Sequence, residues 1–478
     1  MKKLSVLVPF VLSACAVGPD YKREKTEVPT SLPTITSGEQ EMKEAIDVHW
    51  WRIFEDPRLE DLVKFAVEKN LDLEVALARV DEARANLGIA KADFFPSLDL
   101  KALAAKEKVS ENGPLATPLN KESVNVYQLG VNLSYEIDLW GKIRRANEAA
   151  RAELWQSDFN RANVQLTLVS QVVSTYFLMS SLDLQLAIAR DTYLSRKNSY
   201  ELIDKRYKGG LTSELNARQA ESEMHAASAQ VANLEDSVNR AESALAVLLG
   251  RDPKEIIESP LVRGKSMREL AVPPKLPNLL PSTLLERRPD IAAAEQQLIA
   301  ANARIGVAKA YYFPSFSLLG SFGVESTDLK NLFQGPSQSW NFGLGLAMPI
   351  FNGGKTGYLV EAATARQRAA LAQYKKSIQL AFTEVRNALK SYDTGRNAIE
   401  AQKLQVEAVK RNLYLANLRY KNGQSPYLEV LDAERQLYSV QLSLVQSQQA
   451  RLVSVVDLYK ALGGGWANPE SNNTVKNN

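Results

Sequence analysis

The sequence is poor in the residue types on which most catalytic and metal sites depend. It has a single cysteine, Cys15, and two histidines, His49 and His225, among 478 residues. One cysteine excludes an internal disulfide. No metal-ligand spacing, phosphate-binding glycine loop or nucleophile motif surrounds the two histidines. We therefore expect no enzyme activity, no metal site and no bound cofactor.

A surplus of positive charge is also lacking. The chain has 58 Lys and Arg against 55 Asp and Glu, so its formal net charge is only +3. Proteins that bind nucleic acid as their main partner need a strong basic surplus. We therefore expect no nucleic-acid partner. The hydrophobic share of 45% and the charged share of 24% are typical of a folded protein.

The sequence also lacks an unbroken apolar run long enough to span a membrane as a helix. The first residues, "MKKLSVLVPFVLSAC", have a basic start and an apolar stretch that is too short to span a bilayer, which predicts a signal peptide over residues 1–14. We find no other run of about 20 apolar residues. If the protein crosses a membrane, we expect it to do so with β-strands.

The end of the leader predicts a lipid anchor. Leu12-Ser13-Ala14-Cys15 resembles the lipobox of bacterial lipoproteins. This resemblance implies that Cys15 becomes the lipidated N-terminus and carries a covalent diacylglycerol and an acyl chain such as palmitate. Ala at position 16 favours passage to the outer membrane. The alternative is a buried free cysteine. We expect residues 15–56 to form an N-terminal tether.

The chain repeats itself. The phrase "IAKADFFPS" at 89–97 returns as "VAKAYYFPS" at 307–315, which is 218 residues later. The phrase "RYKGGLTSEL" at 206–215 returns as "RYKNGQSPYL" at 419–428, which is 213 residues later. The chain therefore reads as two copies of one unit. We predict repeat 1 at 57–250, an equatorial linker at 251–274, repeat 2 at 275–463 and a polar tail at 464–478.

Each repeat predicts two strands. Over residues 127–138 the odd positions are apolar and the even positions are polar or small, and residues 340–350 also alternate, with the apolar residues at the even positions. A period of two with one apolar face fits a membrane barrel wall. A soluble sheet packed on a core would show the same pattern, so the alternation alone does not separate the two. The predicted strands are 97–109, 124–138, 315–325 and 340–351.

Each repeat also predicts two long helices. Residues 142–209 contain no proline and one glycine. At 1.5 Å per residue, such a helix would reach roughly 100 Å, and it would need coiled-coil packing along its length. The predicted helices are 142–209, 211–249, 354–422 and 424–462.

The number of strands predicts an assembly. Four strands cannot close a membrane barrel, because about eight is the minimum. Open sheet edges are not tolerated in lipid. Three chains would supply twelve strands and six repeat units, so we expect a homotrimer that builds a tube of near six-fold symmetry.

Several motifs now match a known family. They are "CAVGPDY" at 15–21, "WWRIFEDPRLEDLV" at 50–63, "YEIDLWGKIRR" at 135–145, "ERRPDI" at 286–291 and "PIFNGGK" at 349–355, together with the repeated phrases. With them the chain resembles the TolC-like outer-membrane factors of tripartite efflux pumps, and most closely their lipoprotein branch.

This resemblance implies a fold, a location and a function. The fold is a mixed α and β membrane protein, a trimeric twelve-stranded β-barrel that continues into a long α-helical periplasmic barrel. The location is the bacterial outer membrane, with lipid as a partner. The function is a passive duct that exports drugs or other toxic small solutes. The other partners are a periplasmic adaptor protein and an inner-membrane transporter, often of the resistance-nodulation-division type.

The resemblance also implies a gate after the second helical turn. Glu429 and Asp432 are three residues apart and share a helix face. Three copies of each would give acidic rings, which repel unless they are solvated or bind cations. The family's gate role carries over to both residues. Leu428 fits a hydrophobic constriction, Arg435 an ion-pair partner, and Arg419 and Tyr420 latch residues. The alternative is a solvated helix face.

The two helical turns themselves are the predicted contact with the adaptor. In this family such tips meet the adaptor hairpins, and the alternative is that they are connecting turns only. The residues concerned are Gly210, Leu211, Thr212, Ser213, Gly423, Gln424 and Ser425.

Two other functions stay open at this point. A type I secretion duct shares the fold and exports protein. A periplasmic coiled-coil lipoprotein without a pore is the second alternative, although the alternating strands and the duplication argue against it.

Overall fold

We describe a computed structural model of the chain, which covers residues 16–24, 29, 48–108, 123–270 and 281–464. The predicted signal peptide, Cys15, most of the predicted tether and the tail from residue 465 onward lie outside the described residues.

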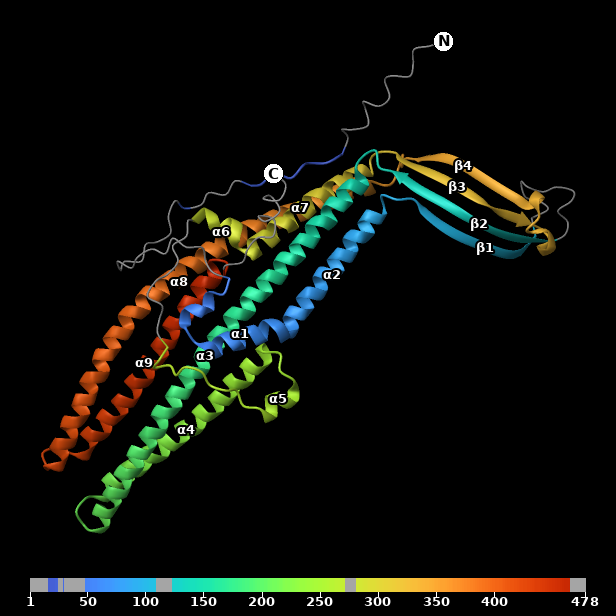
Figure 1. The fold of residues 1–478 in the computed structure, drawn as a ribbon. Coiled ribbons are helices and arrows are strands. Elements are labelled where there is room, and N and C mark those ends of the chain that lie inside the picture. The colour runs from blue at the N-terminus through green and yellow to red at the C-terminus, as the bar shows by residue number, and fades with distance from the viewer. Residues whose placement is uncertain (1–15, 25–28, 30–47, 109–122, 271–280, 465–478) are drawn as a thin grey trace. The chain divides into compact units, whose positions relative to one another are not determined.

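The four predicted strands form one antiparallel sheet in the order β1-β2-β3-β4 (Figure 1). Their bounds are Ser97–Glu107, Val124–Ile137, Ser315–Ser326 and Gln338–Ala347. The prediction for β4 was wrong at its end, where we expected residue 351. Pro349 follows Ala347 after one residue, and proline has no N–H with which to continue a ladder.

The register gives the sheet one apolar and one polar face. Leu100 pairs with Val131, Val131 pairs with Phe322, and Phe322 pairs with Trp340, so one row of large apolar side chains crosses all four strands. The next row on the opposite face is Asp99, Asn132, Ser321 and Asn341. In these two rows the predicted alternation is therefore in phase across all four strands.

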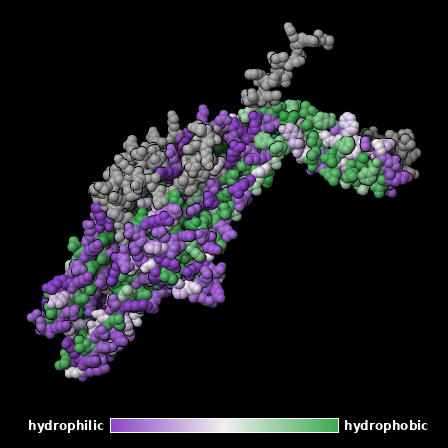
Figure 2. Space-filling model, in the orientation of Figure 1, coloured by the Kyte–Doolittle hydropathy of each residue, from purple (hydrophilic) through white to green (hydrophobic). Residues whose placement is uncertain are grey.

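The apolar face and both sheet edges are open. Trp340, Phe342 and Leu344 on β4 are 75%, 67% and 64% exposed. Hydrophobic side chains gather over the strands in Figure 2. Among the described residues, β1 and β4 each have a strand partner on one side only. Such a sheet is incomplete as it stands, because unpaired edges and large apolar patches both call for a partner.

The helices repeat the plan of the sequence. Helices α2 (Leu71–Ala92) and α7 (Pro289–Ala310) precede β1 and β3. Each second strand is followed by a hairpin of 67 and 35 helical residues. The first hairpin is α3 (Lys142–Lys208) with α4 (Glu214–Leu248), and the second is α8 (Lys355–Lys421) with α9 (Tyr427–Ala461). The equal lengths confirm the duplication.

The second helix of each hairpin begins three residues later than we predicted. In the first hairpin Ser213 occupies the N-cap of α4, and in the second Pro426 occupies the N-cap of α9. The residues that we assigned to the helix starts thus belong to the turns.

Shorter elements complete the fold. Before α2 lie η1 (Trp50–Phe54) and α1 (Pro57–Lys69), and Asp56 caps α1 as the Asp-Pro pair predicts. The predicted linker contains α5 (Pro253–Glu258), and α6 (Pro281–Arg287) precedes α7. Two turns, η2 (Leu329–Asn331) and η3 (Gly335–Ser337), lie between β3 and β4.

The described residues form two compact units, and both units cut across the sequence repeats. One unit holds the sheet with residues 79–92, 142–157, 293–310 and 355–374 of the helices around it. The other holds the hairpin tips, α1, α4, α5 and α9. Each unit takes material from both repeats, so the repeat is a unit of sequence and not of compact folding.

The core of the second unit explains an apolar segment that the sequence analysis missed. Within the described residues one helix, α3, contains an apolar stretch long enough to cross a membrane, and 56% of that stretch is buried inside the fold. Val172, Tyr176 and Phe177 of α3 are fully buried there among residues of α1, α4 and α9. We therefore interpret this apolar stretch of α3 as part of the core of the second unit.

In the first unit, residues 16–24 form a strap along α7 and the start of α3. The Val17 amide donates to the Trp140 carbonyl at 2.9 Å, and Asn302 Nδ2 donates to the Pro19 carbonyl at 2.8 Å. Gly18 crosses Gly306 so closely that a Cβ on Gly18 would lie 2.5 Å from the Gly306 Cα. The described part of the predicted tether is therefore held against the helices.

Candidate functional site at the hairpin tips

The two hairpin turns have the same backbone conformation. Gly210 and Gly423 both lie in the left-handed region, with φ of 72° and 68°. The Leu211 amide donates to the Arg206 carbonyl at 2.8 Å, and the Gln424 amide donates to the Arg419 carbonyl, also at 2.8 Å. This is the six-to-one bond of a Schellman motif, which ends a helix at a left-handed glycine. Residues that are 213 positions apart therefore have the same backbone hydrogen bond and a similar φ at the two tips.

The residues predicted to contact an adaptor lie at these turns. Leu211 is 80% exposed, which leaves a large apolar side chain uncovered at the first tip. Ser213 accepts a hydrogen bond from the Asn216 amide, and Asn216 Nδ2 donates to Thr212 Oγ1 at 2.9 Å. At the second tip Gln424 is exposed, and the Ser425 hydroxyl is buried with no hydrogen-bond partner among the described residues. Contact with an adaptor stays a prediction.

Just behind the turns, the two hairpins share a small core. The buried residues come from all four long helices and are Ile203, Ala217, Ala220, Ala416, Tyr427, Val430, Leu431 and Ala433. The alanines let the helices approach closely. Tyr420, a predicted latch residue, packs its ring 5.2 Å from the ring of Tyr427, so it holds the turn to this core.

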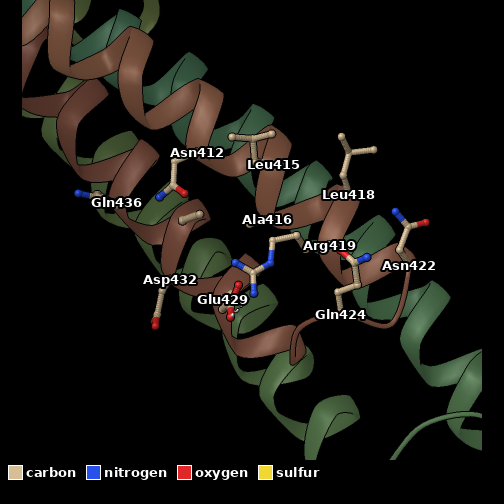
Figure 3. A pocket seen from close by; sticks show the side chains of 11 residues that line it. Asn412, Leu415, Ala416, Leu418, Arg419, Asn422, Gln424, Glu429, Asp432 and Gln436 are labelled. Atoms are coloured by element: carbon tan, nitrogen blue, oxygen red, sulfur yellow. Dashed lines mark ion pairs between the residues drawn. The ribbon is translucent and has the colours of Figure 1, made fainter.

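An open groove of about 480 Å³ runs beside the second tip, between α8 and α9 (Figure 3). Three of the predicted gate residues, Arg419, Glu429 and Asp432, line it. The other lining residues are Asn412, Leu415, Ala416, Leu418, Asn422, Gln424, Ala433 and Gln436. Leu428 is half exposed, and its role as a constriction stays a prediction.

Each predicted gate carboxylate has an arginine beside it. Arg419 reaches from α8 toward Glu429, with 3.7 Å between Nη2 and Oε1. Arg435 lies one turn from Asp432, with 3.5 Å between Nη1 and Oδ1. The carboxylate side chains are 43% and 65% exposed, so each ion pair is worth at most about 1 kcal/mol. Within the chain each of the two predicted gate carboxylates therefore belongs to an ion pair, and the acidic rings stay a prediction.

Arg435 also connects the two hairpins. Its Nε donates to Glu223 Oε1 of α4 at 2.8 Å, and Arg196 Nη1 of α3 lies 2.9 Å from Glu223 Oε2. The Glu223 and Arg196 side chains are only 11% and 8% exposed. Sequence reasoning missed both residues, because helical periodicity does not show which faces of two separate hairpins meet.

Glu434 lies behind this bridge in a second pocket of about 210 Å³, together with Arg196 and Tyr438. Glu434 Oε2 and the Tyr438 hydroxyl are buried and find no hydrogen-bond partner among the described residues. Burial raises the pKa of Glu434 above its ordinary value of 4.5, while the charge of Arg196 opposes that shift and the charge of Glu223 adds to it. Burial in the core behind the turns raises the pKa of Tyr427 above its ordinary value of 10.0.

The two tips differ in charge at matched positions. At the offset of 213 residues, Asn216 corresponds to Glu429 and Gln219 corresponds to Asp432. The first tip therefore presents two neutral amides where the second presents two carboxylates. Comparing the repeats is the sequence signal that singles out Glu429 and Asp432. Among the described residues, no group of three potential ligands could hold a metal ion.

A family model described as "Outer membrane efflux protein" matches the chain twice, over residues 62–251 and 280–464. The two matched ranges follow the two repeats. Together they cover most of the chain.

Similar proteins cover nearly its whole length. A probable outer membrane lipoprotein, SilC of Salmonella typhimurium, is 34% identical over 475 residues, covering 98% of this chain and 99% of SilC. The solvent efflux pump outer membrane protein SrpC of Pseudomonas putida is 35% identical and covers 98% of both chains. Among solved structures, the Campylobacter jejuni CmeC outer membrane channel superposes with a TM-score of 0.88 at 27% identity, covering 97% of this chain and 98% of CmeC.

Proposed function

The chain belongs to the outer membrane efflux protein family and is an outer-membrane efflux channel, and we propose that three copies form one duct that opens and closes at the hairpin tips. The observation that carries this proposal is the sheet, which has four strands, two open edges and an exposed apolar face.

The trimer follows from closing that sheet in lipid. A single chain would leave the backbone groups of β1 and β4 unpaired, and hydrocarbon offers them no hydrogen bonds. Three sheets joined edge to edge give twelve strands and no free edge, which is an even number within the range of known barrels. The apolar face then meets lipid and the polar face lines the lumen.

The partners and the cargo are part of the proposal. Six tips per trimer would meet a periplasmic adaptor, with the exposed side chains of Leu211 and Gln424 among the contacts. An inner-membrane transporter of the resistance-nodulation-division type would supply the energy. The cargo would be drugs or other toxic small solutes, a class that includes the solvents for which the relative SrpC is named.

We also propose that Cys15 carries the lipid anchor. The strap that begins at Ala16 supports this, because it fixes the chain directly after Cys15 against Gly141. The relative SilC is named a lipoprotein, over a match that includes nearly all of both chains.

The closed state would depend on contacts within and between the hairpins. Arg419 holds Glu429 across the second turn, and Arg435 ties α9 to Glu223 of α4. Opening requires the second hairpin to move relative to the first, and it therefore breaks the Arg435–Glu223 contact. A cation or a docking partner that competes for these carboxylates would favour the open state.

The test is ion conductance of the purified protein in a planar bilayer. We expect low conductance for the wild type and higher conductance for the variant with Glu429→Ala and Asp432→Ala. The substitution removes both carboxylates and leaves Arg419 and Arg435 without these partners, so three like-charged clusters repel each other at the tips.

The matched control is Asn216→Ala with Gln219→Ala at the first tip, which we expect to leave conductance at the wild-type level. High wild-type conductance that neither pair of substitutions changes would keep the duct and refute the gate. A folded protein that conducts in no variant, and that is monomeric by mass, would refute the duct.

A further inference from the structure

The polar face of the sheet carries charges of both signs, but in unequal number. The acidic side chains on this face are Asp99, Glu107, Glu136 and Glu325, as the strand register places them. The only basic side chain on this face of the described strands is Lys101 of β1. Lys106 lies on the opposite face, next to Asn125.

Lys101 lies in a row that offers it no partner. Its neighbours across the sheet are Gly130, Gly323 and Ser339. The two glycines let the backbones of β2 and β3 approach, because a Cβ on Gly323 would lie 2.5 Å from the Leu129 carbonyl oxygen. Lys101 is exposed and forms no ion pair or side-chain hydrogen bond with any described residue. Its ammonium group is therefore free to meet a solute.

The space beside Lys101 is a shallow depression of about 220 Å³ in the polar face. Leu129, Gly130, Phe322, Gly323 and Val324 line it, and so do amide and hydroxyl side chains: Gln128, Asn132, Ser321 and Ser339. These groups can all donate hydrogen bonds. An ammonium group with neutral donors around it suits a carboxylate, phosphate or sulfonate group.

We propose that Lys101 sets the charge preference of the barrel lumen and gives anionic groups of exported solutes a favourable contact on a polar face whose other charged side chains, in the described strands, are acidic. This inference rests on the proposed trimeric duct, in which the polar face lines the lumen. Three copies would form one positive ring. The row of Asp99 lies directly on one side of it, and the row of Glu325 lies on the other.

The dimensions of a barrel make this ring effective at moderate salt. Twelve strands about 4.8 Å apart and tilted by about 40° give a backbone radius of roughly 12 Å. A lysine side chain reaches about 6 Å inward, so a solute on the axis passes within about one Debye length at 0.15 M salt, which is about 8 Å. At 1 M salt the Debye length falls to about 3 Å and the effect should shrink.

The first test is the reversal potential of single channels under a KCl gradient. Every variant carries Glu429→Ala and Asp432→Ala, so that the tips are open and identical. We expect Lys101→Gln to lower the chloride-to-potassium permeability ratio about two-fold at 0.1 M salt and Lys101→Glu to lower it further. Asp99→Asn should raise the ratio.

The outcomes of this test distinguish a failure of the role of Lys101 from a failure of the proposed duct. A permeability ratio that is the same for the open-tip parent channel and for the channels with K101Q and K101E overturns the role of Lys101 and leaves the duct intact. If no variant conducts, the duct is refuted and the role of Lys101 falls with it.

The second test places the side chain without measuring current. Because Cys15 is the only native cysteine, Lys101→Cys can be probed in intact cells with a charged, membrane-impermeant thiol reagent. The matched control is Ala102→Cys, one residue along β1 on the apolar face. We expect labelling above the wild-type level at position 101 and none at position 102. Equal labelling at both positions would overturn the assignment of Lys101 to the lumen.

Discussion

The two hairpin tips have the same backbone and different side chains. Their helices have equal lengths, and their turns close with the same hydrogen bonds around Gly210 and Gly423. The charged groups differ, because Glu429 and Asp432 stand where the first tip has Asn216 and Gln219. Duplication thus preserved the geometry of the tube wall, and divergence placed the two carboxylates of the proposed gate in the second repeat alone.

A second matched pair shows the same divergence inside the wall. Glu221 of α4 is paired with Arg218 at 2.8 Å on the surface, whereas its counterpart Glu434 is half-buried and its buried Oε2 finds no partner among the described residues. Glu223 of α4 is buried between two arginines, whereas its counterpart Gln436 is exposed in the groove. Substitutions at equivalent positions of the two repeats should therefore change the free energy of unfolding by different amounts.

The largest expected effect comes from Glu223→Gln. The substitution leaves Arg196 buried without its charge partner, and breaking a buried ion pair from one side costs about 3 kcal/mol of unfolding free energy. It also replaces the charge-assisted hydrogen bond between Arg435 and α4 with a weaker neutral one, so conductance should rise. Thermal unfolding in detergent and bilayer conductance measure the two effects.

The matched control is Gln436→Ala at the equivalent position of α9, which should change stability by less than about 0.5 kcal/mol because the side chain is exposed. If both substitutions lower the free energy of unfolding by the same amount, the ion pairs of Glu223 do not stabilise the protein.

An intermediate effect is expected at the turns. Gly210→Ala and Gly423→Ala each force a Cβ into the left-handed region, which costs about 1 kcal/mol. No atom lies within 4 Å of the added Cβ at either turn, so the two costs should be equal. Hydrogen exchange of the Leu211 and Gln424 amides should speed up by a similar factor. Unequal factors would show that the two turns are not equivalent in energy.

The smallest effect is the pH dependence of Glu434. Because burial raises its pKa in the folded state, its contribution to stability is fully present below its ordinary value of 4.5 and is lost as the pH rises through the raised value. Glu434→Gln should therefore stabilise the protein relative to the wild type at pH 7 and not at pH 4. Unfolding midpoints between pH 4 and pH 8 measure this.

The surface counterpart, Glu221→Gln, provides the comparison. It should lower stability slightly at pH 7, because it removes the exposed pair with Arg218. A wild-type and an E434Q protein with parallel pH curves would contradict the assignment of this pH dependence to Glu434.

Much of the fold could be predicted from the sequence, because the signals are local. A period of two located the strands, the absence of proline located α3 and α8, and the Gly-containing phrases located the turns. The ends were less accurate where one residue decides them, as Pro349 does for β4 and Ser213 does for α4.

The candidate site could be predicted only in part, because its contacts are not local. Glu429 and Asp432 share one helix face, and their spacing shows it. The pairing of Arg435 with Glu223 joins residues 212 positions apart, and no pattern within either helix indicates it. The apolar stretch of α3 was overlooked for a related reason, since only its burial against α1, α4 and α9 distinguishes it from a membrane span.

The open edges of the sheet have a genetic consequence. In the proposed trimer every β1 pairs with the β4 of a neighbour. One chain with a damaged edge strand therefore prevents barrel closure, even when the other two chains are intact. If sound and damaged chains are made in equal amounts and mix freely, only about an eighth of the trimers contain no damaged chain. A proline on β1 should therefore act as a dominant-negative allele.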